Sequence, residues 1–156
     1  THDGTWQKPG DACSFVFTNG VLSSEKIIEA LLSGRVTNCY YPGAFLNLTV
    51  NGKMIGDTVK DAGEPLVASV TCSSNVQMKK IDLVVCGKVV KSWDPGDSLE
   101  FEGEFLIEPA DHSGGLVHRW VLAVMYMKEL DCRNDIEGQF ESSGVRAFTN
   151  PVYIEA

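Results

Sequence analysis

Residues 46–55 read LNLTVNGKMI, and residues 81–90 read IDLVVCGKVV. In the first stretch apolar residues alternate with polar ones, as in a strand that buries one face. Asn51 and Gly52 then supply two residues that tolerate positive φ, which a type I′ hairpin turn requires. The second stretch matches the first position by position and carries Cys-Gly at its turn. The sequence therefore predicts two β-hairpins of one design, which we attribute to convergent turn chemistry rather than to a true repeat.

The same turn chemistry predicts the register of the second hairpin. A two-residue turn at 86–87 places Leu83 opposite Val90 on one face of the hairpin. It places Asp82 opposite Lys91 on the other face, where unlike charges form a favourable cross-strand pair.

The chain after Gly43 continues to favour strands. The segment 99–108 places Glu100, Glu102 and Glu104 on one side, as in a strand with one face in water. The segment 116–127 is apolar on both faces, so it should be a central strand. Seven or so short strands joined by hairpin turns are typical of an immunoglobulin-like antiparallel β-sandwich, which we predict here. Other expected strands, one of them before Gly43, are 35–41, 66–72, 145–148 and 152–154.

A single helix precedes this β region. Ser23 is a suitable N-cap, Leu22 is placed to pack onto the first turn, and Gly34 provides a left-handed stop. The sequence thus predicts a helix over 24–33 after a strand over 13–17. The apolar stripe of this helix needs a covering surface, because an exposed stripe favours association. The stripe consists of Ile27, Ile28, Leu31 and Leu32.

The composition excludes several classes of function. The chain has 156 residues and a net charge of −8 without clustered Lys and Arg, which argues against nucleic acid and anionic membranes as partners. Its apolar runs are far shorter than a membrane span of about 20 residues. Five cysteines without a C-x-x-C pair exclude a zinc ribbon and a thioredoxin-type motif. Because a core of this size needs no disulfides, we favour reduced thiols and a cytoplasmic location over a disulfide framework.

Few residues point to chemistry. His2, His112 and His118 show no metal-ligand spacing, and we expect His118 to be a structural histidine within a strand. The acidic loop 131–137 lacks the ligand order of a calcium loop. Cys86 should be exposed at its turn, but it has no general base to activate it as a nucleophile. These residues alone form no complete active site.

Three stretches together resemble a known family. Residues 1–3 read THD and precede the strand CSFVF, and residues 22–36 read LSSEKIIEALLSGRV and lead into LNLTVNGKMIGD. The close at 146–154 reads RAFTNPVYI. This series resembles the C-terminal part of the PHP (polymerase and histidinol phosphatase) metal-dependent hydrolases of the CehA/McbA-like branch. In that family a barrel with a multinuclear metal site is followed by a β-sandwich that ends in a T-N-P motif.

The resemblance implies a division of the chain. Residues 1–43 would be the final strand-and-helix remnant of the αβ barrel, and residues 44–156 an accessory β-sandwich domain. His2 would be the histidine of the last D-x-H metal motif, whose aspartate precedes Thr1 while the other ligands lie farther upstream. The parent enzyme would use divalent Zn, Mn or Fe to activate water against a phosphoester or related bond. One histidine binds a metal weakly, so this chain alone should be catalytically silent.

The resemblance also implies partners. The sandwich would brace the barrel of the same polypeptide, cover part of the mouth of the metal site, or mediate a homodimer. The alternative is a non-catalytic immunoglobulin- or fibronectin-like binding module of a secreted or surface protein. That alternative predicts disulfides and exposed aromatic residues on one sheet. A third possibility, an independent small enzyme, requires a site that the sequence does not show.

Overall fold

The computed structural model describes residues 13–18, 20–40, 43–109, 118–128 and 145–155, and these residues are mainly β. The one helix among them is α1 (Ser24–Leu32). The strands are β1 (Cys13–Val16), β2 (Val36–Cys39), β3 (Phe45–Val50), β4 (Lys53–Met54), β5 (Thr58–Lys60), β6 (Leu66–Ser73), β7 (Met78–Val85), β8 (Lys88–Trp93), β9 (Glu100–Ile107), β10 (Arg119–Met127), β11 (Val145–Thr149) and β12 (Val152–Glu155).

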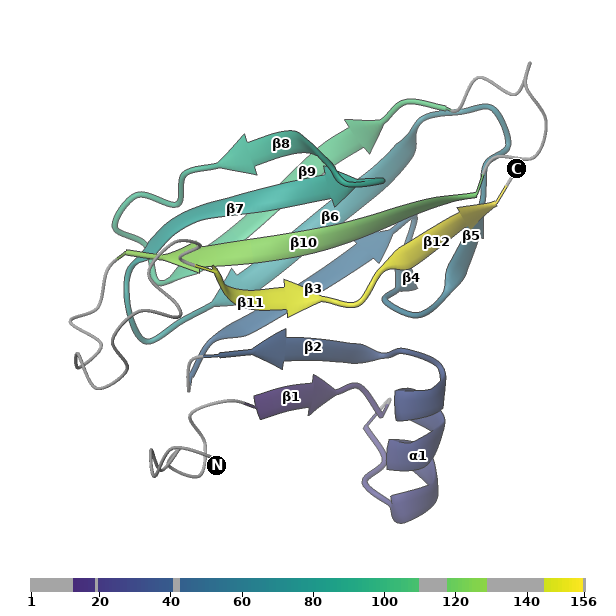
Figure 1. Cartoon of the computed structure of the whole chain (residues 1–156), viewed down its shortest axis with the longest axis horizontal. Coiled ribbons are helices and arrows are strands. Elements are labelled where there is room, and N and C mark those ends of the chain that lie inside the picture. The colour runs from purple at the N-terminus through teal and green to yellow at the C-terminus, as the bar shows by residue number, and fades with distance from the viewer. Residues whose placement is uncertain (1–12, 19, 41–42, 110–117, 129–144, 156) are drawn as a thin grey trace, which may run out of the picture.

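The first sheet is built around β10, which confirms the central strand predicted there. One edge of β10 pairs with β7, and β7 pairs with β8 (Figure 1). The other edge is shared, because the start of β10 pairs with β12 and its end with β11. From β11 the sheet continues to β2 and β1, all antiparallel, whereas β5 runs parallel to β12.

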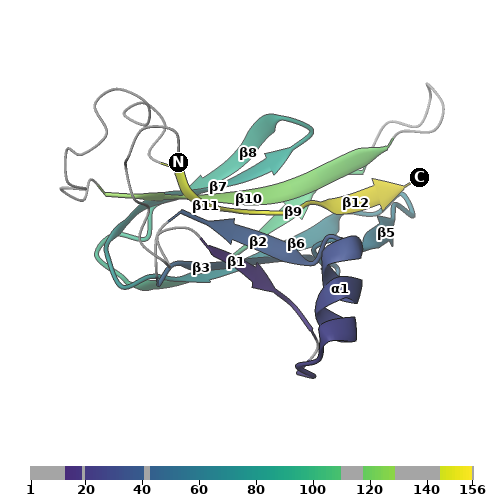
Figure 2. The ribbon, with the colours of Figure 1, turned by 60° about the horizontal axis from the view of Figure 1, so that its bottom comes forward.

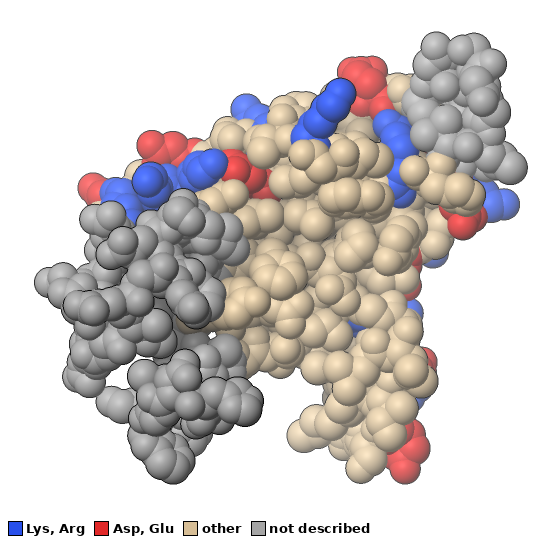
Figure 3. All heavy atoms as spheres, in the orientation of Figure 1, with Lys and Arg blue, Asp and Glu red and all other residues tan. Residues whose placement is uncertain are grey.

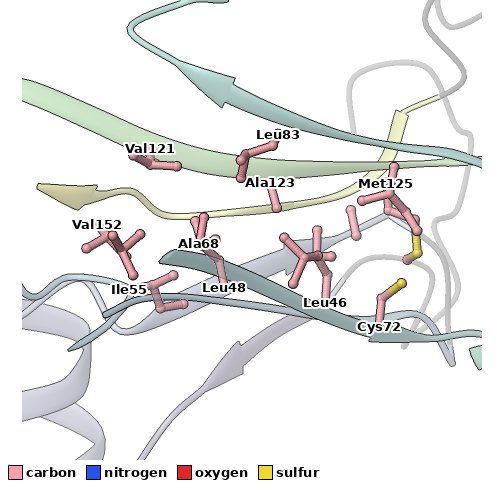
Figure 4. Packing of buried hydrophobic residues seen from close by; sticks show 14 of the residues in the cluster. Leu46, Leu48, Ile55, Ala68, Cys72, Leu83, Val121, Ala123, Met125 and Val152 are labelled. Atoms are coloured by element: carbon pink, nitrogen blue, oxygen red, sulfur yellow. The ribbon is translucent and has the colours of Figure 1, made fainter. Parts of the chain in front are cut away.

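The second sheet has the order β4–β3–β6–β9 and lies against the first (Figure 2). Side chains from both sheets fill the space between them (Figure 4). Leu46 and Leu48 of β3 are fully buried there, as are Val121, Ala123 and Met125 of β10. Burial of one large aliphatic side chain stabilises a fold by about 1.5–3 kcal/mol. This layer therefore holds the two sheets together.

Both predicted hairpin turns form. Asn51 and Cys86 adopt positive φ angles of 47° and 48°, and the glycine after each of them is also at positive φ. This pair of conformations is the one that a type I′ turn requires, so the turn prediction is confirmed in both hairpins.

The predicted register of the second hairpin is wrong. A bulge between Leu83 and Val84 shifts the pairing by one residue, so Leu83 lies opposite Lys91 and Asp82 lies opposite Ser92. A bulge inserts one extra residue into one strand, and turn chemistry alone does not reveal it. The expected charge pair between Asp82 and Lys91 is therefore absent from this ladder.

The helix begins and ends close to its predicted bounds. The Ser23 hydroxyl accepts a hydrogen bond from the Lys26 amide at 3.2 Å, and Gly34 has a φ of 72°, so both end signals are confirmed. The predicted packing of Leu22 on the first turn is wrong, since this side chain is 84% exposed. Ala30 is the only buried residue of α1.

The N-terminal segment contributes strands to the first sheet. β2 pairs with β11, and β1 pairs with β2 at the edge. Phe15 and Phe17 place their rings 5.6 and 6.1 Å from the ring of Phe45, which belongs to the second sheet. The first sheet thus bends toward the second along β2 and β1 (Figure 2). The boundary between residues 43 and 44 stays a prediction, as does the barrel origin of the first segment.

Candidate functional site

The predicted metal ligand, His2, lies outside the described residues. The same holds for His112, Cys132 and the acidic loop 131–137. The expectation that His118 is a structural histidine within a strand is wrong, because His118 is exposed and lies just before β10 begins at Arg119. Within the described part of the chain, no group of three or more His, Cys, Asp or Glu side chains could hold a metal ion.

The T-N-P motif of the resemblance forms a junction between three parts of the fold. Thr149 is buried, and its hydroxyl accepts a hydrogen bond from the Ala123 amide at 3.0 Å. The Asn150 side-chain amide donates to the Gly34 carbonyl at 3.0 Å, while its backbone amide donates to the Val36 carbonyl. We call this set of contacts the helix junction, because it fixes the end of α1 and the start of β2 to β11.

Gly56 completes the helix junction. Its amide donates to the Pro151 carbonyl at 2.8 Å, and its φ is 84°. A Cβ atom at this position would lie 2.0 Å from the carbonyl oxygen of Ser33. Only glycine lets the two backbones approach this closely. An ion pair beside it joins Arg35 to Asp57 at 3.2 Å, so the helix is held by backbone and side-chain contacts at once.

The helix that the junction holds presents its apolar side chains to solvent. Leu32 and Ile28 of this helix are 85% and 56% exposed, and Leu22, which precedes its N-cap, is 84% exposed. In Figure 3 the helix projects below the sheets, and the side of it that faces the viewer is largely uncharged. We call this surface the α1 patch; it consists of Val21, Leu22, Ile28, Leu31 and Leu32. The stripe was expected to be covered by the sandwich or by another copy of the chain, and the sandwich does not cover Ile28, Leu31 and Leu32.

The α1 patch has the chemistry of a contact surface. Solitary exposed apolar residues are common in proteins, but a group of them on one helix and in the two residues before its N-cap is typical of an interaction site. The charged residues Lys26 and Glu29 pair with each other at 2.6 Å on the same helix. Lys26 and Glu29 already neutralise each other. A partner that covers the patch would therefore bury aliphatic side chains without having to supply a charge of its own for either residue.

A polar cluster lies on the first sheet, on the face turned away from the core. The Asp82 side chain is 1% exposed, and its two oxygens accept hydrogen bonds of 2.6 Å from Lys80 and from Ser92. The hydrogen bond to Asp82 raises the pKa of Lys80, and burial raises the pKa of Tyr126. The Lys80 ammonium also lies 4.2 Å from the Tyr126 ring centroid. These contacts satisfy the buried carboxylate, so we assign the cluster a structural role.

Two buried thiols should make stability fall at alkaline pH. Burial raises the pKa of Cys39 and of Cys72 to about 12. Each folded pKa is above the unfolded value, so their contribution is complete below about pH 8.5 and is lost as pH rises toward 12. We expect roughly 2–3 kcal/mol less stability per thiol at about pH 10.5 than at neutral pH, measured by urea unfolding. Cys72→Ala should reduce this difference, whereas Cys86→Ser at the exposed turn should leave it unchanged. A Cys72→Ala protein with the full alkaline loss would contradict the expectation.

Comparison with protein-family models, with curated proteins and with solved structures finds no match for this chain. Within the described residues, α1 is too short and too weakly apolar to cross a membrane.

Proposed function

We propose that this chain is the C-terminal accessory part of a PHP-type metal-dependent hydrolase, with an immunoglobulin-like sandwich over residues 44–156. The strand order favours that sandwich, because β3–β6–β9 within the second sheet and β8–β7–β10–β11 within the first correspond to the three- and four-stranded sheets of such domains. The remaining strands, β4 in the second sheet and β1, β2, β5 and β12 in the first, extend the two sheets beyond that pattern. The helix and the T-N-P motif, which carry the resemblance, meet each other in the helix junction.

The α1 patch is the observation that carries the functional part of the proposal. A helix that buries only Ala30 in its own chain still carries Ile28, Leu31 and Leu32 on its surface. The barrel of the parent enzyme would cover this patch, and the sandwich would then brace the barrel or cover part of its metal site. His2 would contribute one ligand to that site, with Zn, Mn or Fe as the expected metals and a phosphoester or related bond as substrate. The cytoplasm remains the expected compartment, and a homodimer through the same patch is the expected state of the chain alone.

The test uses the polypeptide extended by the coding sequence that precedes residue 1. We expect bound divalent metal and hydrolysis of p-nitrophenyl phosphate that a chelator abolishes. Leu31→Ser/Leu32→Ser in the extended protein should lower its melting temperature by several degrees and weaken hydrolysis, because the barrel loses its contact. Ser24→Ala, at an exposed position in the first turn of the same helix, is the matched control and should change neither quantity.

One observation favours the second candidate, a non-catalytic binding module. Aromatic side chains gather on the outer face of the first sheet, where Tyr40 and Tyr153 are about half exposed and Tyr40 stacks near Phe148 with 6.0 Å between ring centroids. Figure 3 shows few charged side chains over the middle of this face. If the extended protein held neither metal nor hydrolytic activity, and had no Asp before Thr1, the first proposal would fail and this candidate would take its place.

A further inference from the structure

Two cysteines lie directly opposite each other where β1 pairs with β2. Cys13 is the register partner of Cys39, so both side chains project from the same face of the sheet. Cys39 is 1% exposed in the core, and Cys13 is partly buried and packs against the same core. Both thiols are free in the structure. This is the only direct cysteine pairing in the strand ladders of the described residues.

The Cα spacing of the two residues lies within the range that disulfides span. The Phe17 amide donates to the Arg35 carbonyl at 3.0 Å, so this pair of residues is a hydrogen-bonded pair. Hydrogen-bonded pairs recur every second residue along an antiparallel ladder. Cys13 lies four residues before Phe17 and Cys39 four residues after Arg35, so Cys13 and Cys39 are also a hydrogen-bonded pair. Such pairs have Cα atoms about 5.5 Å apart, within the commonest range for disulfides. Their Cβ atoms are also about 5.5 Å apart, wider than the roughly 3.8 Å of a relaxed disulfide, so the bond would form with a local shift of β1 and would be strained and readily reduced.

We propose that Cys13 and Cys39 form a cross-strand disulfide when a small-molecule disulfide such as glutathione disulfide is present, and that this bond fastens β1 to the first sheet. β1 is the edge strand and pairs only with β2 among the described strands. A covalent bond to Cys39 would anchor it to a residue that is already fixed in the core. The inference concerns the N-terminal strand itself and is independent of the proposed function.

The chemistry is thiol–disulfide exchange. The thiolate of Cys13, which is the more exposed of the two, attacks one sulfur of glutathione disulfide, forms a mixed disulfide and releases one glutathione thiolate. Cys39 then loses its proton to solvent, attacks the Cys13 sulfur and releases the second glutathione. The protein dithiol is oxidised by two electrons, glutathione disulfide is reduced to two glutathione molecules, and the two protons end on the glutathione thiolates. Burial raises the pKa of Cys39 to about 12, so the second step should limit the rate and accelerate with pH.

The other described cysteines are less well placed for such a bond. Cys72 lies opposite Leu46 and Phe101 in the second sheet, and its thiol is 3.5 Å from the Met78 sulfur. Cys86 is exposed at its hairpin turn, where its sulfur lies 4.0 Å from the Trp120 carbonyl. Oxidation should therefore leave Cys72 reduced and modify Cys86 without linking it to Cys13.

The experiment incubates the full chain in buffers of increasing glutathione disulfide content, blocks the remaining thiols by alkylation, and maps linked peptides by mass spectrometry. We expect a peptide that links Cys13 to Cys39. The oxidised protein should melt a few degrees above the reduced one, since the bond closes a loop that contains the whole of α1 while its strain offsets part of that gain.

Cys13→Ala is the principal control, because Cys13 is the less buried member of the pair. It should remove both the linked peptide and the rise in melting temperature, while Cys86→Ser should keep both. Cys39→Ala, which leaves a small cavity in the core, should also remove the linked peptide. The proposal would be overturned by a chain that keeps Cys13 and Cys39 reduced while Cys86 is fully modified. It would equally fail if Cys13 paired with another cysteine or if the oxidised Cys13→Ala protein showed the same thermal shift.

Discussion

Gly56→Ala should destabilise the protein by about 3 kcal/mol or more. The added Cβ would lie 2.0 Å from the backbone oxygen of Ser33, far inside van der Waals contact, and φ at this position is 84°. A backbone oxygen cannot move aside as a flexible side chain can, so the turn after α1 must shift. That shift would break the hydrogen bond from Gly56 to Pro151 and strain the bond from Asn150 to Gly34. Urea unfolding measures the loss, and amide hydrogen exchange should show faster opening of α1 and β2 than of β10.

Gly52→Ala is the matched control for this prediction. Gly52 has a φ of 74°, and a Cβ added there would meet nothing within 4 Å. It therefore carries the conformational cost of alanine at positive φ, about 1–2 kcal/mol, without the clash. Equal destabilisation by the two substitutions would show that the backbones at Gly56 and Ser33 do not approach as closely as described.

This difference between two glycines illustrates what the sequence could reveal. The Asn51-Gly52 turn was predictable, because its two conformations depend on adjacent residues alone. The role of Gly56 was not, because its constraint comes from Ser33, which the fold brings alongside it. Ser23 and Gly34, which mark the two ends of α1, also act through adjacent residues alone, so the sequence predicts both.

The misses share a physical cause. The register of the second hairpin changed because of a bulge beside Leu83, which leaves no mark in the apolar pattern. The short strand β5 was missed because it pairs in parallel with β12, which lies at the other end of the chain. The segment 116–127 is apolar on both faces, yet only one face of β10 lies in the core between the sheets: Val121 is fully buried there, whereas the neighbouring Trp120 is half-buried. The apolar pattern along a strand shows which residues share a face. It does not show whether another sheet covers that face, because this depends on the tertiary structure.

The candidate site was predictable only in part. An apolar stripe on the helix could be recognised from its spacing, and so could the need for a surface to cover it. The amphipathic pattern could not show that Ile28 and Leu32 remain exposed in this chain. The pairing of Cys13 with Cys39 likewise had no signal in sequence, because it depends on the register between two strands separated by the helix.

Arg119→Met should cost about 3 kcal/mol, because it removes one partner of a buried ion pair. The Arg119 guanidinium lies 2.6 Å from an Asp61 oxygen, and the two side chains are 12% and 1% exposed. The same guanidinium donates to the Glu108 carbonyl at 2.9 Å. The pair fastens the start of β10 to the segment after β5, where the Asp61 amide also donates to the Glu155 carbonyl. A buried carboxylate deprived of its guanidinium partner loses far more than an exposed one would. Thermal unfolding should show a melting temperature lower by about 10 °C.

Two further variants separate the ion pair from the packing of the arginine stem. Lys128→Met removes a surface cation that lies 3.5 Å from Asp97, with side chains 43% and 89% exposed, and should change stability by no more than about 0.5 kcal/mol. Asp61→Asn/Arg119→Met replaces the charged carboxylate by a neutral amide of similar shape, so it should recover a large part of the loss caused by Arg119→Met alone. If the double variant were no more stable than Arg119→Met, the cost would come from lost side-chain packing and not from the charge of Asp61. If Lys128→Met were as damaging as Arg119→Met, burial would not be what distinguishes the two pairs. The expected order of stability, from most to least stable, is therefore Lys128→Met, then the double variant, then Arg119→Met. This order follows from the solvent exposure of the two ion pairs.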